Sequence, residues 1–153
     1  MSSVNDNIKK ILKENKVDYE VIKHDYVRTA EEAAQERGME TPEKGIKSLI
    51  FKTKENSFIL VLVPGNKRAR TSKIARLEKT KRIFLASPKE VKEVSGVDVG
   101  AVAPFGLKTK LKTYIDEDIL GKDVIYFSTG THYETVKMKP QSLLKILKDP
   151  ILF

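Results

Sequence analysis

The sequence predicts an α+β protein that forms a single domain. Several β-rich runs are mixed with helical segments without strict alternation, a pattern that favours α+β. The chain has 153 residues, and its 40% hydrophobic and 33% charged residues are typical of a soluble globular domain with its own core. No internal repeat, low-complexity tract or linker divides the chain, so residues 1–153 are taken as one domain.

The chain begins with a helix, a strand and a second helix. Apolar residues at helical spacing predict a helix over residues 5–15, and alternation predicts a strand over residues 17–22. The segment from Thr29 has the pattern of a capping box, in which the Thr29 hydroxyl caps the helix and Glu32 reaches back. This second helix is expected to end near Gly38.

The middle of the chain predicts a hairpin followed by shorter elements. Residues 46–53 and 57–63 are β-rich and are joined by a short polar turn. The second run is continuously apolar, which predicts a central strand covered on both faces. A helix is expected over residues 72–78, a short strand over 82–86, and a helix over 87–94 that opens with a capping box.

The last third of the chain continues the mixed pattern. Strands are expected over residues 111–116, 123–128 and 134–138. The acidic residues 116–118 are interpreted as the start of a helical turn, because a helix N-terminus favours negative charge. An amphipathic helix is expected over residues 140–147.

A glycine- and proline-rich loop over residues 96–106 separates these two parts. It holds three of the eight glycines of the chain and one proline. Glycine permits backbone conformations that other residues avoid, and proline stiffens the chain. The spacing Gly100-x-x-x-Pro104 therefore predicts a stiff loop whose exposed N–H groups could hold a small ligand or an oxyanion. The alternative is a tight connection with no function of its own.

The net charge of +8 is concentrated in one segment. Residues 67–82 contain one acid, Glu78, and eight basic residues, namely Lys67, Arg68, Arg70, Lys73, Arg76, Lys79, Lys81 and Arg82. A basic block of this kind attracts a phosphate backbone, and the alternative interpretation is a solvated helix face.

The residue types exclude several kinds of chemistry. The absence of cysteine excludes disulfides, thiol catalysis and zinc–thiolate sites. The two histidines, His24 and His132, are far apart in sequence, and no metal-binding cluster, phosphate-binding loop or dinucleotide motif occurs, so neither a metal nor a cofactor is expected. With no signal peptide and no apolar run of membrane length, a cytoplasmic location is expected. An enzyme of this composition would depend on backbone donors, one or two lysines and groups of its substrate.

Six pieces of the sequence, in order, resemble the YbaK family of prolyl-tRNA synthetase-associated editing domains, over roughly residues 24–147. The pieces are residues 29–34, 46–50, 62–67, 85–91, 96–106 and 114–118. The resemblance implies a single domain with a strongly curved mixed sheet closed into a barrel-like core and helices packed outside. It also implies hydrolysis of the ester between a wrong amino acid and a tRNA 3′ end, without a cofactor.

The resemblance also assigns site residues. Lys47 matches the lysine of the family's Lys-Thr-Leu motif, and residues 100–104 match the loop that positions the aminoacyl group, so Lys47 and Gly100 are the expected catalytic positions. Catalysis in the family is substrate-assisted, through the terminal ribose hydroxyl and a water. Further contacts with the substrate are expected from Ser48, Ala101, Val102, Ala103, Pro104, Thr29, Gly130 and His132. Contacts with the tRNA backbone are expected from Lys67, Arg68, Arg70 and Lys73.

Two departures from the family pattern lie where amino-acid specificity is set. Ser48 replaces a threonine, and Ala103 replaces a serine or proline, which leaves the substrate open. Simple structural interpretations also exist for Lys47 as a surface lysine at a strand end, for Thr29 as a helix cap and for His132 as an exposed loop residue.

Three functions stay open on the sequence alone. The leading one is a free-standing trans-editing deacylase for a mischarged tRNA of the proline system, such as Cys- or Ala-tRNA(Pro), with an aminoacyl-tRNA synthetase as a second partner to be tested. The second is a catalytically silent tRNA- or synthetase-binding module of the same fold, and the third is a general nucleic-acid-binding protein. Lys47 and Gly100 discriminate between them, because a pure binding module needs neither.

Overall fold

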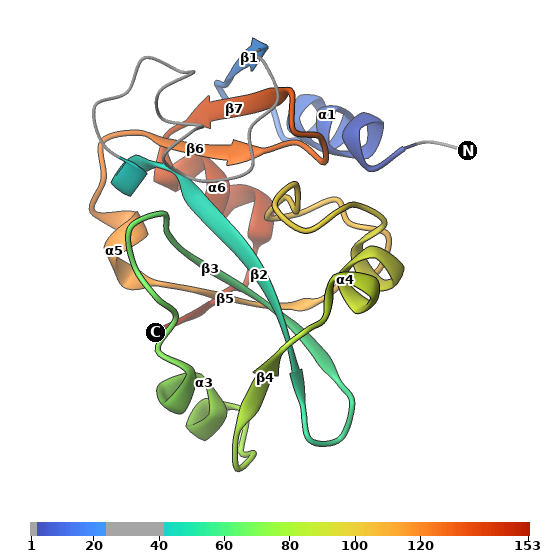
Figure 1. The fold of residues 1–153 in the computed structure, drawn as a ribbon. Helices are drawn as coiled ribbons and strands as arrows, with labels where there is room; N and C mark the ends of the chain where they lie inside the picture. Colours follow the sequence, from blue (N-terminus) through green and yellow to red (C-terminus); the bar gives the residue numbers. More distant parts are fainter. Residues whose placement is uncertain (1–2, 24–41) are drawn as a thin grey trace.

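The computed structural model describes residues 3–23 and 42–153 (Figure 1). Its elements are α1 Val4–Glu14, β1 Glu20–Lys23, the 3-10 helix η1 Pro42–Lys44, β2 Ile46–Thr53, β3 Phe58–Pro64, α3 Thr71–Leu77, β4 Ile83–Leu85, α4 Pro88–Ser95, β5 Lys112–Ile115, α5 Glu117–Leu120, β6 Ile125–Ser128, β7 Glu134–Met138, α6 Pro140–Leu147 and β8 Ile151–Leu152. The mixture confirms the expected α+β class. The helix predicted over residues 29–38, with Thr29, lies outside the described residues, as does His24.

The described strands form two sheets. The larger sheet has five strands in the order β4-β2-β3-β5-β8, and the smaller has three in the order β1-β7-β6. The larger sheet is mixed, because β2 runs antiparallel to β3 and β4 whereas β5 runs parallel to β3 and β8. A single parallel bridge between Gly45 and Tyr126 links the two sheets. Neither sheet closes on itself among the described residues, so the strand pairing there does not support the barrel-like core that the resemblance implied.

The hairpin of β2 and β3 is the centre of the larger sheet. Its register runs from Ile46 opposite Pro64 to Lys52 opposite Phe58, which confirms the predicted hairpin. The strand β3 lies between β2 and β5, and all its residues after Phe58 are buried. The continuous apolar run is therefore explained by burial on both faces of the sheet.

Two hydrophobic cores lie on opposite faces of this hairpin. On one face, Ile50 and Leu62 pack into a cluster with α1, α4, α6 and the smaller sheet. On the other face, Phe51 and Val63 pack into a second cluster with α3 and with Phe153 near the end of β8. In Figure 1, α1, α6 and the smaller sheet accordingly lie at one end of the molecule, and α3 lies with β4 at the other.

A polar cluster ties α3 to β5. Glu78, at the end of α3, accepts hydrogen bonds from the Tyr114 hydroxyl and, at 2.6 Å, from Lys112 Nζ. Burial and the Glu78 carboxylate raise the pKa of Tyr114, so its hydroxyl remains a donor. Burial opposes ionisation of Glu78, but Lys112 and Tyr114 outweigh it and lower the pKa of Glu78. The one acid of the basic segment is therefore used to fix α3 in place.

The strand β8 was not predicted from the sequence. It adds to β5 through pairs such as Tyr114 with Ile151, and the Phe153 N–H donates to the Ile115 carbonyl at 3.1 Å. A two-residue strand is too short to show alternation, so only the pairing across the sheet reveals it. No helix among the described residues is long and apolar enough to cross a membrane.

Candidate functional site

The loop that follows α4 is a tight turn built around Gly100. The helix α4 ends at Ser95 and is capped by Gly96, whose φ is 84°. The Ala101 N–H donates to the Asp98 carbonyl at 3.0 Å, and Gly100, the third residue of this turn, has a φ of 88°. A turn with positive φ at its third position is of type II, which favours glycine there. The geometry of the turn therefore gives position 100 a structural reason to be glycine.

This loop has an exposed tip and a buried arm. Val99 at the tip exposes 52% of its surface, and Gly100 is also exposed, whereas residues 101–105 are all buried. Ala101, Val102, Ala103 and Pro104 were expected to contact the substrate, and the structure places their side chains in the interior. A ligand at the tip therefore meets Asp98, Val99 and Gly100 and not the side chains of the buried arm.

The helix α1 clamps the loop through close contacts at glycines. A Cβ atom on Gly106, whose φ is 74°, would lie 2.9 Å from Cγ1 of Ile8, closer than real Cβ contacts. A Cβ on Gly96 would lie 3.2 Å from Cγ2 of Val4, and Asn7 Nδ2 donates to the Gly106 carbonyl at 3.3 Å. The glycines at both ends of the loop therefore let α1 approach its backbone.

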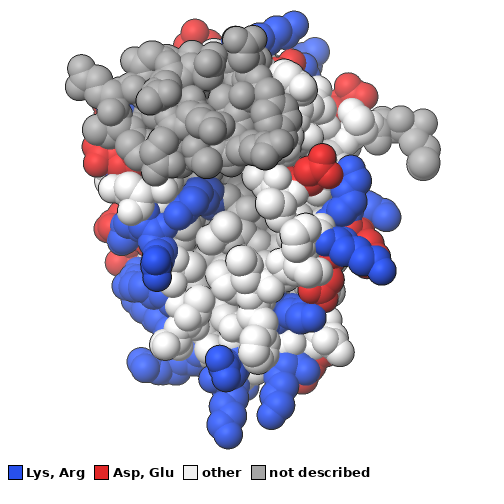
Figure 2. Space-filling model, in the orientation of Figure 1, with Lys and Arg blue, Asp and Glu red and all other residues white. Residues whose placement is uncertain are grey.

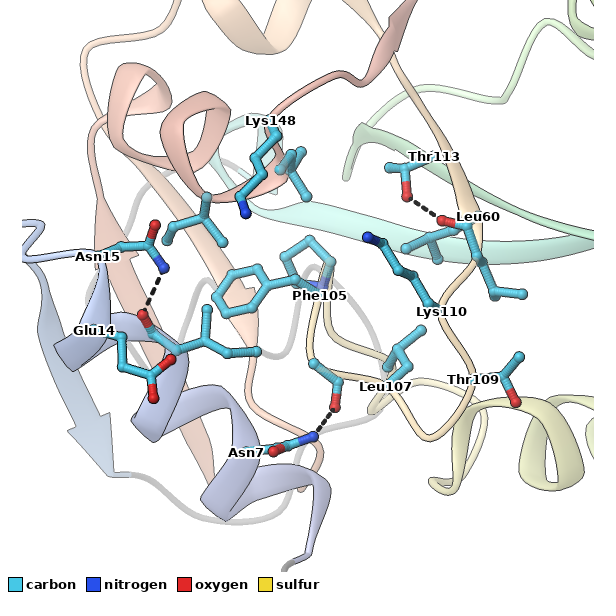
Figure 3. Close-up of a pocket in the computed structure, with 16 residues that line it drawn as sticks. Asn7, Glu14, Asn15, Leu60, Phe105, Leu107, Thr109, Lys110, Thr113 and Lys148 are labelled. Atoms are coloured by element: carbon cyan, nitrogen blue, oxygen red, sulfur yellow. Dashed lines mark hydrogen bonds between the residues drawn. The ribbon is translucent and has the colours of Figure 1, made fainter.

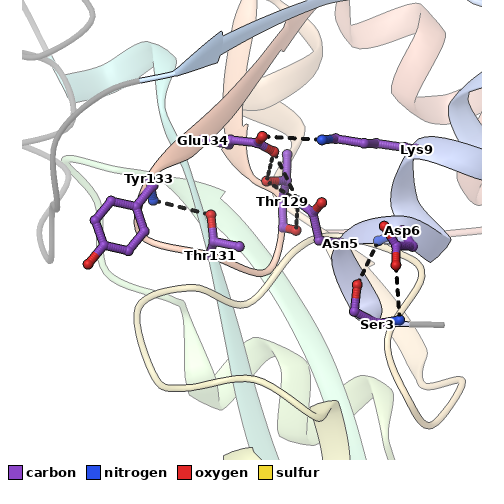
Figure 4. A network of polar contacts seen from close by, with 8 residues as sticks. All are labelled: Ser3, Asn5, Asp6, Lys9, Thr129, Thr131, Tyr133 and Glu134. Atoms are coloured by element: carbon purple, nitrogen blue, oxygen red, sulfur yellow. Dashed lines mark hydrogen bonds and ion pairs between the residues drawn. The ribbon is translucent and has the colours of Figure 1, made fainter. Parts of the chain in front are cut away.

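The same helix is joined to the turn between β6 and β7 by a polar network (Figure 4). Asn5 Nδ2 lies 3.0 Å from both the Thr129 carbonyl and Glu134 Oε2, and Lys9 Nζ lies 3.2 Å from Glu134 Oε1. Burial opposes ionisation of Glu134, but the hydrogen bonds from Asn5 and Lys9 outweigh it and lower the pKa of Glu134. Sequence analysis missed Asn5 and Glu134, because their partners are more than a hundred residues away along the chain.

Two of the expected substrate contacts lie in that turn. Gly130 has a φ of 89°, and a Cβ on it would lie 3.2 Å from Cγ1 of Val4 and 3.4 Å from Cγ1 of Val97. His132 follows and is half-buried. The β6–β7 turn, the start of α1 and the start of the Gly100 loop are thus packed together.

Lys47 and Ser48 are adjacent in β2 and so face opposite sides of the larger sheet. Ser48 lies opposite Leu62, on the face that packs against the buried arm of the loop, and Lys47 lies opposite Val63 on the other face. The structure therefore does not bring these two side chains together. Lys47 sits two residues after Gly45, at the bridge between the two sheets.

The hydroxyl of Ser48 is an unusual buried group. Its Oγ has no hydrogen-bond partner among the described residues. Leaving a buried hydroxyl unpaired costs roughly 1–3 kcal/mol, and a bound substrate group or water would recover this cost.

A pocket of about 410 Å³ lies behind the loop, between α1, residues 104–111 and the end of α6 (Figure 3). Phe105 and Ile11 contribute apolar walls, and Glu14, Lys110 and Lys148 contribute charges. Because Pro104 and Phe105 also line this pocket, it borders the buried arm that supports the tip.

Carboxylates of the chain itself hold two of the four cations that were expected to bind tRNA. The buried Asp116 caps α5 through the Asp118 N–H at 2.9 Å. Asp116 Oδ2 lies 3.4 Å from Lys67 Nζ, and Asp116 Oδ1 lies 4.0 Å from the Arg70 guanidinium. Lys67 also pairs with Asp118, and this hydrogen bond raises the pKa of Lys67. The Arg70 guanidinium lies 5.2 Å above the Phe153 ring.

The other two cations that were expected to bind tRNA, Arg68 and Lys73, are not paired in this way among the described residues. In the described part of the chain, Arg68 and Lys73 have no carboxylate within ion-pair distance, since the pairs of this segment involve Lys67 and Arg70. Figure 2 shows Lys and Arg side chains on both sides and along the lower edge of an uncharged central area. Among the described residues, no cluster of three or more His, Asp or Glu could hold a metal ion.

Known proteins with similar sequences and structures define the family. The family described as "Aminoacyl-tRNA editing domain" matches residues 24–146. The chain is 30% identical over 146 residues to the Multifunctional Ser/Thr-tRNA deacylase ProXp-y of Escherichia coli (strain K12), and the match covers 93% of this chain and 87% of that protein. It is 32% identical over 109 residues to a proline–tRNA ligase of Thermosipho melanesiensis, covering 71% of this chain and 19% of the ligase. The solved structure of a "putative trans-editing enzyme for prolyl tRNA synthetase" matches with a TM-score of 0.85 at 30% identity, over 100% of this chain and 96% of that one.

The chain belongs to the aminoacyl-tRNA editing domain family. The resemblance drawn from the six sequence pieces is confirmed, and so is the class of activity expected from it, the deacylation of aminoacyl-tRNA. The family match begins at residue 24, so the contacts that α1 makes with the loop come from outside the matched region.

Proposed function

We propose that the chain is a free-standing trans-editing deacylase, acting in the cytoplasm on a mischarged tRNA of the proline system. The observation that carries this proposal is the Gly100 turn, an exposed tip held by a buried arm in a chain of the editing family. The E. coli relative, named as a deacylase, is matched over most of its length, which supports action without an attached synthetase. The ligase relative supports the link with proline.

The need for such an enzyme follows from the limits of binding selectivity. An apolar pocket separates small side chains by a factor of only about 10–200, which is too little for translation, so a second hydrolytic site has to remove the errors. The small residue Ser48, on the face of the larger sheet that packs against the loop, supports a small amino acid as the group removed. Alanine and cysteine are the first candidates.

In the proposed reaction a water oxygen adds to the carbonyl carbon of the ester. The bond between that carbon and the oxygen of the terminal ribose then breaks, and the ribose oxygen takes up the proton that the water gives up. The neighbouring ribose hydroxyl orients the water, so the protein supplies no nucleophile. Backbone N–H groups near Gly100 hold the aminoacyl group. Because Lys47 lies on the other face of the larger sheet from the buried arm, we assign its ammonium to oxygens of the terminal adenosine, which it holds in position for the reaction.

A panel of mischarged tRNAs tests this function. The purified protein is incubated with tRNA(Pro) charged with alanine, cysteine or proline and with tRNAs charged with serine or threonine, and the release of the amino acid is followed. Release of at least one wrong amino acid, with correctly charged Pro-tRNA(Pro) spared, is the expected result.

The catalytically silent module makes the opposite claim. A folded protein that binds tRNA but releases no amino acid faster than buffer alone, across the whole panel, would replace the deacylase by that module.

A further inference from the structure

A second cavity, of about 420 Å³, lies at the corner between α3 and β4, away from the Gly100 loop. Three cationic side chains line it, namely Arg76, Lys81 and Arg82, together with the three hydroxyl residues Thr71, Ser72 and Thr80. No carboxylate belongs to its described lining. This composition is that of a site for an anion, because guanidinium, ammonium and hydroxyl groups all donate hydrogen bonds to oxygen.

The fold builds this cavity by turning the chain back over the end of α3. The Thr80 N–H donates to the Ala75 carbonyl at 3.0 Å, and the Lys79 N–H donates to the Arg76 carbonyl at 3.1 Å. With Lys79 at a φ of 57°, these two bonds form a Schellman motif. The motif carries Lys81 and Arg82 back beside Arg76, so cations that are close along the chain line one cavity.

The surroundings leave these charges available. Glu78, the one acid of the segment, is committed to Tyr114 and Lys112. In contrast to Lys67 and Arg70, the residues Arg76 and Lys81 have no ion-pair partner in the part of the chain that the structure describes. The Arg82 guanidinium lies 5.1 Å above the Phe84 ring, which orients it without neutralising it.

One lining residue carries an unpaired buried atom. Oγ1 of Thr80 is buried and lacks a hydrogen-bond partner among the described residues. Buried hydroxyls are normally paired, and Thr80 lines the cavity, so an acceptor bound there is a candidate partner for this hydroxyl. An anion with several acceptor oxygens would satisfy Thr80 and the cations together.

We propose that this α3–β4 pocket binds a phosphate group, and that in the working enzyme this group is a backbone phosphate of the tRNA at a distance from the aminoacylated end. The inference rests on the proposed function for the identity of the RNA. A diester phosphate offers oxygens to a bidentate arginine and to the hydroxyls, and the cavity has room for the attached sugar. The pocket would therefore position the tRNA body, while the Gly100 loop holds its 3′ end.

The test uses the double variant Arg76→Gln/Lys81→Gln, which removes two charges and keeps polar side chains. The matched control is Lys139→Gln/Lys145→Gln, which removes two exposed charges at α6, at the other end of the molecule. Binding of uncharged tRNA is measured over a salt series by fluorescence anisotropy. We expect the pocket variant to bind about 10-fold more weakly or worse, with a salt slope smaller by about one to two, and the control to stay within about 2-fold of wild type.

Substrates of two lengths distinguish a defect in this pocket from a defect in the catalytic site. With full-length mischarged tRNA, the pocket variant is expected to show a raised KM and an unchanged kcat. With an aminoacylated CCA trinucleotide, which lacks the tRNA body that the pocket is proposed to hold, variant and wild type should be equal. A pocket variant that equals wild type in tRNA affinity and in KM would overturn the proposal, even if the wild type deacylates well. If the wild type deacylates no substrate but the pocket variant binds tRNA more weakly than the wild type, the proposed function is wrong and the proposed phosphate pocket is still supported.

Two further measurements test the role of the Thr80 hydroxyl and the identity of the bound anion. Thr80→Val removes the unpaired hydroxyl and preserves the shape of the side chain, so we expect weaker tRNA binding by about 3-fold or more with no loss of thermal stability. If the hydroxyl has a purely structural role, its removal would instead lower thermal stability and leave tRNA binding unchanged, which counts against the proposal.

In the second measurement, inorganic phosphate and ATP are titrated while the backbone amide signals of Thr80 and Lys81 are followed by NMR. Weak binding of inorganic phosphate that is displaced by tRNA supports a site for an RNA phosphate. Tight binding of ATP that tRNA does not displace would assign the pocket to a free nucleotide and overturn the proposal.

Discussion

Gly100 and Lys79 share a left-handed backbone, with φ values of 88° and 57°, but only one of them is a glycine. A residue with a Cβ is strained in this conformation, and the size of that strain decides how a substitution can be interpreted. At the residue scale, a change at Gly100 is therefore expected to have two effects, one on deacylation and one on folding stability. The sequence alone could not separate them, because it does not give the φ of this residue.

Gly100→Ala is expected to lose deacylation and also to lose about 1 kcal/mol or more of folding stability, because alanine is strained at positive φ. Activity is measured per folded molecule, well below the unfolding temperature. Gly100→Asn serves as the companion variant, since asparagine tolerates this backbone better but still adds a side chain at the tip. If folded Gly100→Ala deacylates at the wild-type rate, the loop only turns the chain.

Lys47→Ala is expected to reduce deacylation on the order of 100-fold or more with the fold intact, because a charge that holds the terminal adenosine in position for the reaction would be removed. Turnover at saturating substrate is the measurement. Lys54→Ala, at the exposed turn of the same hairpin, is the matched control and should keep its activity. Near wild-type turnover in Lys47→Ala would remove Lys47 from the site.

At the scale of elements, local chemistry explains what could be predicted. The capping box at α4 is confirmed in both directions, with Glu90 N–H to Ser87 Oγ at 3.2 Å and Ser87 N–H to Glu90 Oε1 at 2.9 Å. Asp116 caps α5, as its place in an acidic cluster indicated. The turn at the end of α3 gave no such signal, because a lysine stands where the Schellman motif favours glycine.

Lys79→Gly should therefore raise the free energy of unfolding by roughly 0.5–1 kcal/mol, the relief of left-handed strain less the extra backbone entropy of glycine. Urea unfolding measures the difference. Lys54→Gly, at a position without positive φ, is the control and should bring no gain. Equal or lower stability of Lys79→Gly would show that the lysine side chain contributes contacts at this turn.

The contact between β2 and α4 predicts a dependence of stability on pH. Glu90 Oε2 lies 2.8 Å from Lys52 Nζ, and this hydrogen bond, with that from the Ser87 N–H, lowers the pKa of Glu90 from 4.5 to about 2. A lowered pKa in the folded state means that the stabilisation is complete above about pH 4.5 and is lost as the pH falls toward 2. Glu90→Gln should be less stable than wild type at pH 6, and the difference should vanish near pH 2 in chemical unfolding. A difference that is constant with pH would contradict this, and Glu93→Gln, on the exposed side of α4, is the control.

At the scale of the whole molecule, the sequence indicated the class, the hairpin and the loop, because each depends on neighbours along the chain. It could not indicate that Asn5 would meet Glu134, or that Lys67 and Arg70 would meet Asp116, since these contacts depend on the packing of distant segments. The candidate site shares this limit. The loop was recognisable by its glycines, but its burial from Ala101 onward and its clamp by α1 follow only from the assembled fold.

The basic segment shows what this difference means for function. Sequence grouped Lys67, Arg68, Arg70 and Lys73 as one set of tRNA contacts, whereas the structure divides them into two paired and two unpaired cations among the described residues. Lys67 and Arg70 compensate the buried carboxylate of Asp116, and a buried charge that loses its partners is destabilising. The two pairs of residues should therefore fail in different ways when they are removed.

We expect Lys67→Ala/Arg70→Ala to lower the thermal midpoint and to change the salt dependence of tRNA binding little, because these charges are already neutralised by Asp116 and Asp118. Arg68→Ala/Lys73→Ala should keep the thermal midpoint and reduce the salt slope by about one for each phosphate that the variant no longer binds. Both double variants remove two positive charges from the same segment, so each controls for the net charge of the other. Thermal unfolding and salt titrations of tRNA affinity are measured on the same preparations. An equal reduction of the salt slope in the two variants would show that the pairs with Asp116 and Asp118 open when tRNA binds, and an unchanged slope in both would remove this part of the segment from the interface.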